Sequence, residues 1–100
     1  MRFFHRTRPT VAAAILAEGF RDGTGTYLTT NTYTGVWISD QALDENEGAF
    51  GDTLLSIDIP EEVVSEFEWI EEGKGHREFL VPAEIVNRFG PPNVAIDDTR

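Results

Sequence analysis

The chain has 100 residues, of which 40% are hydrophobic and 26% charged, and its formal net charge is −10. This length supports one domain with a single core. The negative charge argues against general binding to DNA or RNA, because phosphates require basic partners. No cysteine is present, which excludes disulfides and thiolate chemistry. The sequence also has no apolar run of about eighteen residues, so we expect no membrane span and a cytoplasmic location.

The beginning of the chain predicts a strand followed by a helix. Residues 2–6 are rich in aromatic side chains, which suit a pleated strand. Apolar residues then recur at helical spacing, so we predict an amphipathic helix over residues 8–18. Thr7 is its expected N-cap, Pro9 lies in its first turn, and Gly19 is its expected left-handed C-cap.

The middle of the chain predicts two strands separated by polar segments. Residues 21–34 are rich in Gly, Thr and Asn, which predicts a loop or short irregular strands. Residues 35–39 form a compact apolar run and predict a strand. Residues 40–51 are polar, and we expect a short helix or an ordered loop there. Residues 52–59 alternate between apolar and polar side chains and predict another strand.

Short elements are expected in the last part of the chain. Residues 60–62 open a helical turn, where the acidic side chains suit the positive end of a helix. Residues 67–70 and 77–82 predict strands, the second of them preceded by a glycine-containing turn. Residues 82–89 predict a short helix, which the Gly-Pro-Pro sequence after it would end.

These elements predict an α+β fold, a small split β-sheet domain with packed helices. Their order does not follow the regular alternation of strand and helix that a parallel sheet requires. We expect a single domain over residues 1–92 and a frayed tail over residues 93–100. The chain has no internal repeat and no linker.

Few residues could carry chemistry. His5 ends the first predicted strand, where a backbone-bonded histidine is the alternative to a functional one. Glu78 lies at the start of a strand that we expect to be buried. A carboxylate there is either exposed to solvent, or it needs a bonding partner or a functional role. His76 precedes it in a turn. The sequence contains no HxH or HExxH spacing, no GxSxG motif and no phosphate-binding glycine loop, so it predicts no metal site.

Three segments together resemble a known family. Phe4-His5-Arg6-Thr7 and the helix after it resemble the opening of the ADP-ribosyltransferases of the diphtheria-toxin and poly(ADP-ribose) polymerase type, which have a His-Gly-Thr motif there. Gly35-Val36-Trp37-Ile38-Ser39 is similar to their second motif, Gly-Ile-Tyr-Phe-Ala/Ser. Arg77-Glu78-Phe79-Leu80-Val81-Pro82 is similar to their third, a strand of the type Glu-Tyr-Val-Val. The tRNA 2′-phosphotransferases share this fold and the use of NAD.

The resemblance implies a protein that binds NAD, cleaves its nicotinamide–ribose bond and transfers ADP-ribose to an acceptor, which a protein could supply. Glu78 would be the catalytic carboxylate. It would hold the 2′-hydroxyl of the nicotinamide ribose and stabilise the oxocarbenium-like transition state. His5 would bond the adenosine ribose. Trp37 would stack on the nicotinamide ring, and a buried core aromatic is the alternative interpretation of this residue.

Further residues complete the expected nucleotide-binding set. The backbone around Arg6 would hold the nicotinamide amide, and Thr7 and Ser39 belong to the first and second motifs. Tyr27, in the Gly- and Thr-rich loop, would cover the nucleotide or simply pack against the fold. The acidic segment 44–48 would bind an acceptor or a second ligand, or would be a solvated surface.

Three departures from the family pattern leave the activity open, one of which is that the chain is shorter than most such enzymes. Arg6 stands where the family has glycine, and Trp37 replaces a tyrosine and so lacks its hydroxyl. Two alternatives therefore stand beside the enzyme. One is a non-catalytic nucleotide- or protein-binding module on the same fold. The other is an acidic partner protein of the inhibitor or antidote type, which would bind a basic partner in a salt-sensitive way.

Overall fold

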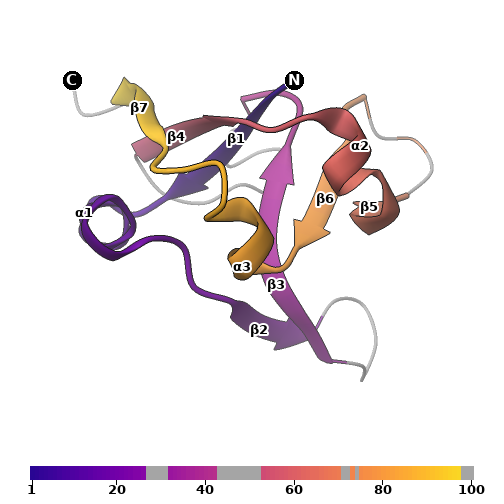
Figure 1. The fold of residues 1–100 in the computed structure, drawn as a ribbon, viewed down its shortest axis with the longest axis horizontal. Helices are drawn as coiled ribbons and strands as arrows, with labels where there is room; N and C mark the ends of the chain where they lie inside the picture. Colours follow the sequence, from indigo (N-terminus) through magenta and orange to yellow (C-terminus); the bar gives the residue numbers. More distant parts are fainter. Residues whose placement is uncertain (27–31, 43–52, 71–72, 74, 98–100) are drawn as a thin grey trace.

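The structure is a computed structural model that describes residues 1–26, 32–42, 53–70, 73 and 75–97. An antiparallel sheet has the strand order β5-β6-β3-β1-β4-β7, and β2 pairs with the outer half of β3 (Figure 1). The strands of the described part are β1 Arg2–Thr7, β2 Gly23–Thr26, β3 Thr32–Ser39, β4 Thr53–Asp58, β5 Glu68–Trp69, β6 Glu78–Val81 and β7 Asn93–Asp97. The helices are α1 Pro9–Glu18, α2 Glu61–Val64, the 3-10 turn η2 Ser65–Phe67 and α3 Ala83–Val86.

The predicted α+β class is confirmed, because an antiparallel sheet carries a few short helices. Strands appear at each of the predicted strand segments that the structure describes, and α1 matches the predicted first helix. Gly19 ends α1 at a positive φ of +91°, as expected, but its ψ of 172° is not that of the left-handed helical cap that we predicted. Within the described residues, no helix is long and apolar enough to cross a bilayer.

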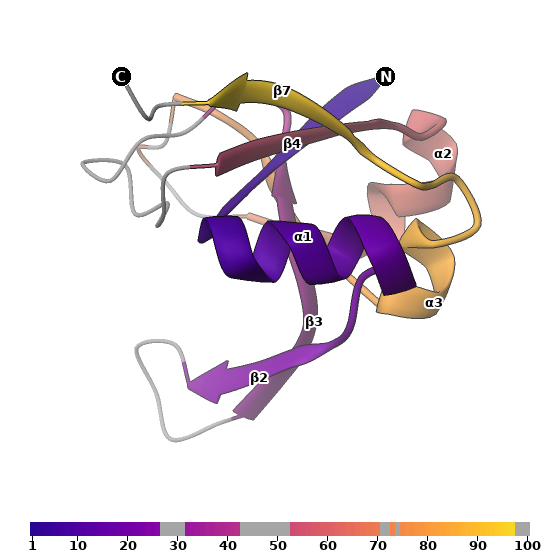
Figure 2. The ribbon, with the colours of Figure 1, turned by 90° about the vertical axis from the view of Figure 1, so that its left-hand side faces the viewer.

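The core lies between the helices and one face of the sheet. Phe3 of β1 and Phe79 of β6 are both fully buried and meet edge-to-face, with ring centroids 5.1 Å apart. Ala12 and Ile15 of α1 join the same cluster, and α1 runs between β4 and β2 (Figure 2). Since side chains alternate along a strand, the residues next to Phe3 and Phe79 start from the other face of the sheet.

The sheet divides between β1 and β3, its two central strands. β1 pairs with β4 along its whole length, whereas its pairing with β3 holds at Phe4 and Ser39 alone. Beyond that pair, β3 continues outward to form its hairpin with β2. The described strands thus form one continuous sheet, in which the pairing of β1 with β3 is reduced to a single register pair next to His5.

Two expectations about element ends are wrong. Thr7 is not a helix cap, because it continues β1 and pairs with Thr53 of β4, and the extended N-cap position falls to Arg8. The expected fraying does not hold for Asn93–Asp97, which form β7 and pair with β4. The partner of β7 lies about forty residues away, so local composition did not reveal the pairing. Residues 43–52, where a helix or loop was expected, lie outside the described part.

Candidate functional site

A cavity of about 320 Å³ lies where the sheet divides. β1 and β3 form its floor, α1 forms one side, and the segment that leaves α1 for β2 closes it. Apolar side chains dominate the walls, and the polar groups are few. Among the described residues, its lining consists of His5, Val11, Ala14, Ile15, Glu18, Gly19, Phe20, Arg21, Gly23, Gly35, Val36 and Trp37.

His5 is the polar group that the fold builds into this cavity. It shares a face of β1 with Phe3, and its Nδ1 lies 2.7 Å from the backbone carbonyl oxygen of Trp37. Nδ1 must donate this hydrogen bond, because a carbonyl oxygen only accepts. Nε2 of the neutral ring is then an acceptor. The bond takes the place of a ladder bond where β1 and β3 have separated.

The free nitrogen of His5 is open to a ligand. Nε2 has no hydrogen-bond partner among the described residues, and that part of the chain leaves no buried side-chain nitrogen or oxygen without a partner. Nε2 must therefore reach solvent through the cavity. Burial lowers the pKa of His5, and the bond to the Trp37 carbonyl offsets this in part. The ring is thus neutral near pH 7 and accepts a hydrogen bond.

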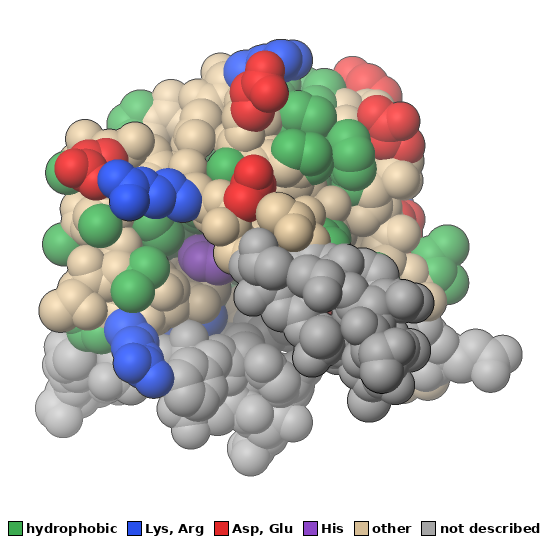
Figure 3. Space-filling view, turned by 90° about the horizontal axis from the view of Figure 1, so that it is seen from below, with side chains coloured by type: hydrophobic (Ala, Val, Ile, Leu, Met, Phe, Trp, Pro, Cys, Tyr) green, Lys and Arg blue, Asp and Glu red, His purple; other side chains and the backbone are tan. Residues whose placement is uncertain are grey.

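The segment after α1 supplies an aromatic wall and a charged rim. Phe20 is buried and meets His5 edge-on, with ring centroids 5.5 Å apart. Arg21 and Glu18 form an exposed ion pair of 2.9 Å at the rim. Seen from the β2 side, the surface is hollowed around a histidine side chain, with Lys or Arg side chains nearby (Figure 3).

Trp37 belongs to the cavity and to the other face of the sheet. Its backbone accepts the bond from His5, and the residue lines the cavity. It alternates with the core residues Val36 and Ile38, so its indole starts from the face opposite the helices. There it meets Trp69 of β5 edge-on, with ring centroids 5.4 Å apart. A stacking role for Trp37 stays a prediction.

Glu78 and Ser39 lie on that other face and do not line the cavity. Glu78 alternates with Phe79 and pairs across the ladder with Ser39 and with Trp69. Its side chain is only 17% exposed, and its Oε1 lies 2.8 Å from Nε2 of His76, whose side chain is 7% exposed. We expected Glu78 to need a partner, and in the structure His76 is bonded to it. The structure separates Glu78 from His5, and its catalytic role stays a prediction.

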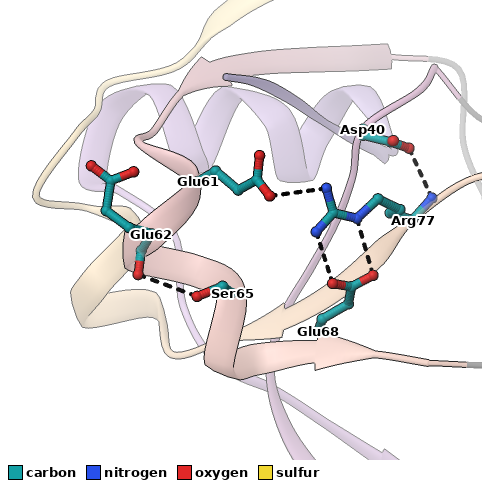
Figure 4. A network of polar contacts seen from close by, with 6 residues as sticks. All are labelled: Asp40, Glu61, Glu62, Ser65, Glu68 and Arg77. Atoms are coloured by element: carbon teal, nitrogen blue, oxygen red, sulfur yellow. Dashed lines mark hydrogen bonds and ion pairs between the residues drawn. The ribbon is translucent and has the colours of Figure 1, made fainter.

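A network centred on Arg77 fixes the strand that carries Glu78. Its guanidinium makes two bonds to Glu68, of 3.0 and 2.8 Å, and one of 3.2 Å to Glu61. Its backbone N–H donates to the Asp40 carboxylate. These charge-assisted bonds hold the pKa of the Glu68 carboxyl below its usual value. Figure 4 shows the three carboxylates around Arg77. The network ties β5, the start of β6 and α2 together.

The remaining expected site residues fall elsewhere. Arg6 alternates with His5 and pairs with Leu54 of β4, so its side chain starts away from the cavity. Thr7 ends β1 and is not among the lining residues. Tyr27 and the acidic segment 44–48 lie outside the described residues. In the part of the chain that the structure describes, no three potential metal ligands cluster together.

Sequence reasoning missed the wall formed by Phe20 and Arg21. The contact of Phe20 with His5 depends on how α1 packs over β1, which no local pattern indicates. Asn87, whose side chain bonds both backbone groups of Phe20, was also missed. An isolated asparagine after a short helix gives no local indication of such a role.

Comparison of the chain with models of known protein families, with characterised proteins and with solved structures finds no match.

Proposed function

We propose that the protein is a nucleotide-binding module on an ADP-ribosyltransferase-like fold, and that the cavity beside His5 holds one nucleoside half of NAD or of a related nucleotide. The observation that carries the proposal is the neutral His5, whose Nε2 offers an acceptor inside an otherwise apolar cavity. A buried, oriented acceptor of this kind suits a ligand that brings a hydroxyl or an N–H group.

The cavity fits one nucleoside better than a whole dinucleotide. Its volume of about 320 Å³ is at the lower end of the roughly 300–1,000 Å³ of ligand pockets. A ribose hydroxyl would donate to His5 Nε2, and the base would lie against Phe20 and the apolar side of α1. Arg21, at the rim, would meet a phosphate once it exchanges its bond to Glu18. The nucleotide would therefore lie in the cavity where β1 and β3 separate.

A second candidate is transfer of ADP-ribose to a protein or another acceptor, with a cytoplasmic location as expected. The observation in its favour is that the three resembling segments lie on neighbouring strands in the order β6-β3-β1. Glu78 would act on the nicotinamide ribose, with its carboxylate held by His76. This function requires the ligand to pass through the split from His5 to Glu78, because the two side chains start from opposite faces.

Calorimetric titration with NAD, ADP-ribose, AMP and nicotinamide tests the binding proposal. We compare wild type with His5→Asn, whose amide can still donate to the Trp37 carbonyl but offers no acceptor at the Nε2 position. Arg88→Ala is the control, since Arg88 forms an exposed pair with Glu84 away from the cavity. We expect His5→Asn to lose about tenfold or more in affinity. If wild type and His5→Asn bound the nucleotides with equal affinity, the cavity beside His5 would not be the binding site.

Release of nicotinamide from NAD distinguishes the two candidates. Binding without release, under several acceptor conditions, supports the binding module. Release that Glu78→Gln abolishes, with nucleotide affinity unchanged, supports the transferase. Release that is equal in wild type and Glu78→Gln would exclude Glu78 from the chemistry.

A further inference from the structure

The wall that closes the cavity is attached to a different part of the chain. Gly19, Phe20 and Arg21 line the cavity after α1 has ended. The side chain of Asn87, just after α3, accepts a 2.8 Å bond from the Phe20 backbone N–H and donates a 2.9 Å bond to the Phe20 carbonyl. Asn87 thus pairs with Phe20 as a neighbouring strand would.

The start of α3 is bonded to the same segment. The Asp22 carboxylate accepts a 2.8 Å bond from the backbone N–H of Ala83, the first residue of α3. In Figure 2, α3 lies beside the C-terminal end of α1. The segment from Gly19 to Asp22 is therefore fastened to α3 at both of its ends, although more than sixty residues separate them in sequence.

Gly19 makes this attachment possible. A Cβ atom on Gly19 would lie 3.0 Å from Oδ1 of Asn87, and its φ of +91° already disfavours other residues. The close approach brings Phe20 to the core side, where it is buried and contacts His5. A continuous series of contacts thus runs from Asn87 through Phe20 to His5, and from His5 to the Trp37 carbonyl.

We infer that Asn87 is a positioning residue for the ligand cavity: by bonding both backbone groups of Phe20, it holds the aromatic wall against His5 and so sets the ligand-binding geometry. This inference rests on the proposed nucleotide binding, but the geometry of the wall can be tested without a ligand.

The test compares Asn87→Ala and Asn87→Asp with Arg88→Ala, the neighbouring exposed control. Asn87→Ala removes both bonds to Phe20. Asn87→Asp keeps the acceptor for the Phe20 N–H and removes the donor to its carbonyl. We expect nucleotide affinity to fall about five- to thirtyfold in Asn87→Ala and at least as far in Asn87→Asp, because its second carboxylate oxygen would face the Phe20 carbonyl oxygen, with no change in Arg88→Ala. Affinity is measured by calorimetry with ADP-ribose, well below the unfolding temperature of each variant.

NMR titration of the His5 ring in the ligand-free protein is the second measurement. Among the described lining residues, the charged side chains beside the neutral His5 are Glu18 and Arg21, which bond each other. In Asn87→Ala the displaced Phe20 exposes the ring, so its titration midpoint should move up toward that of a free histidine. A purely global destabilisation would not move this midpoint while the protein stays folded.

The outcomes separate the inference from the proposed function. If wild type binds no nucleotide, the proposed function fails, and the His5 midpoint still decides whether Asn87 positions the wall. An unchanged midpoint in Asn87→Ala overturns the inference. Unchanged ADP-ribose affinity in a folded Asn87→Ala variant of a wild type that binds also overturns it. Should Asn87→Ala not fold, Asn87→Asp supplies both measurements.

Discussion

Replacement of His5 by phenylalanine tests the link between the cavity and the stability of the fold. The phenyl ring keeps a flat aromatic side chain next to Phe20, although it is larger than the imidazole, but it cannot donate to the Trp37 carbonyl. Loss of a donor from a partly buried carbonyl costs about 1–3 kcal/mol. For a domain of this size, 1 kcal/mol lowers the melting temperature by about 4–8 °C. We therefore expect His5→Phe to melt about 4–24 °C below wild type at pH 7.5.

The same substitution should make stability less dependent on pH. Burial lowers the pKa of His5 in the folded state, so the unfolded chain takes up a proton first as the pH falls below about 6.5. Proton uptake by the unfolded state alone destabilises the wild type, and the loss continues until the pH passes the folded pKa. His5→Phe has no titrating ring at this position and therefore does not show this pH-dependent loss of stability. The difference in stability between wild type and variant should therefore shrink between pH 7.5 and pH 5.5.

Urea unfolding at several pH values measures both effects. His5→Asn is the matched control, because it retains a donor for Trp37 and lacks the titrating ring. It should lose less stability than His5→Phe at pH 7.5 and show the same weakened pH dependence. The carboxyls of Glu68 and Asp58, whose pKa values are also lowered, titrate at more acidic pH and remain in all variants. If the difference in unfolding free energy between wild type and His5→Phe stayed constant from pH 7.5 to 5.5, a lowered pKa of His5 in the folded state would be refuted.

Two further substitutions test the packing that positions the cavity. Phe79→Ala empties a fully buried site and breaks the contact with Phe3, so we expect a loss of about 3–5 kcal/mol in urea unfolding, and a smaller loss for Leu80→Ala on the half-buried face. Gly19→Ala places a Cβ 3.0 Å from Asn87 Oδ1 at positive φ, and we expect a loss of about 1–2 kcal/mol in thermal unfolding. Gly75→Ala, with no atom within 4 Å of its Cβ position, is its control; equal losses in the two glycine variants would contradict the close approach.

The local patterns of the sequence determined most of the secondary structure. Helical spacing placed α1 within one residue of its N-terminal boundary, and the alternation of Asp52–Ile59 placed β4. Both patterns depend on which side chains a regular element must bury, and that information is local. Alternation also placed Glu78 and Phe79 on opposite faces of their strand, which the structure confirms through the burial of Phe79.

Only the tertiary structure determined which residues contact the buried and exposed faces of these elements. The bond from His5 to the Trp37 carbonyl exists because β1 and β3 separate after Phe4 and Ser39. No pattern in either strand encodes that separation. The pairing of β7 with β4 likewise joins segments about forty residues apart.

The sequence therefore predicted only some of the residues that form the candidate site. His5 was identified because histidines are rare in this chain and this one ends a strand beside a helix. Glu78 was grouped with it by the order of three short segments, yet the sheet turns the two side chains toward opposite faces. Asn87 reaches Phe20 across 67 residues of sequence. A local pattern specifies which face of an element is apolar, but the position of a distant polar side chain follows only from the packing of the whole fold.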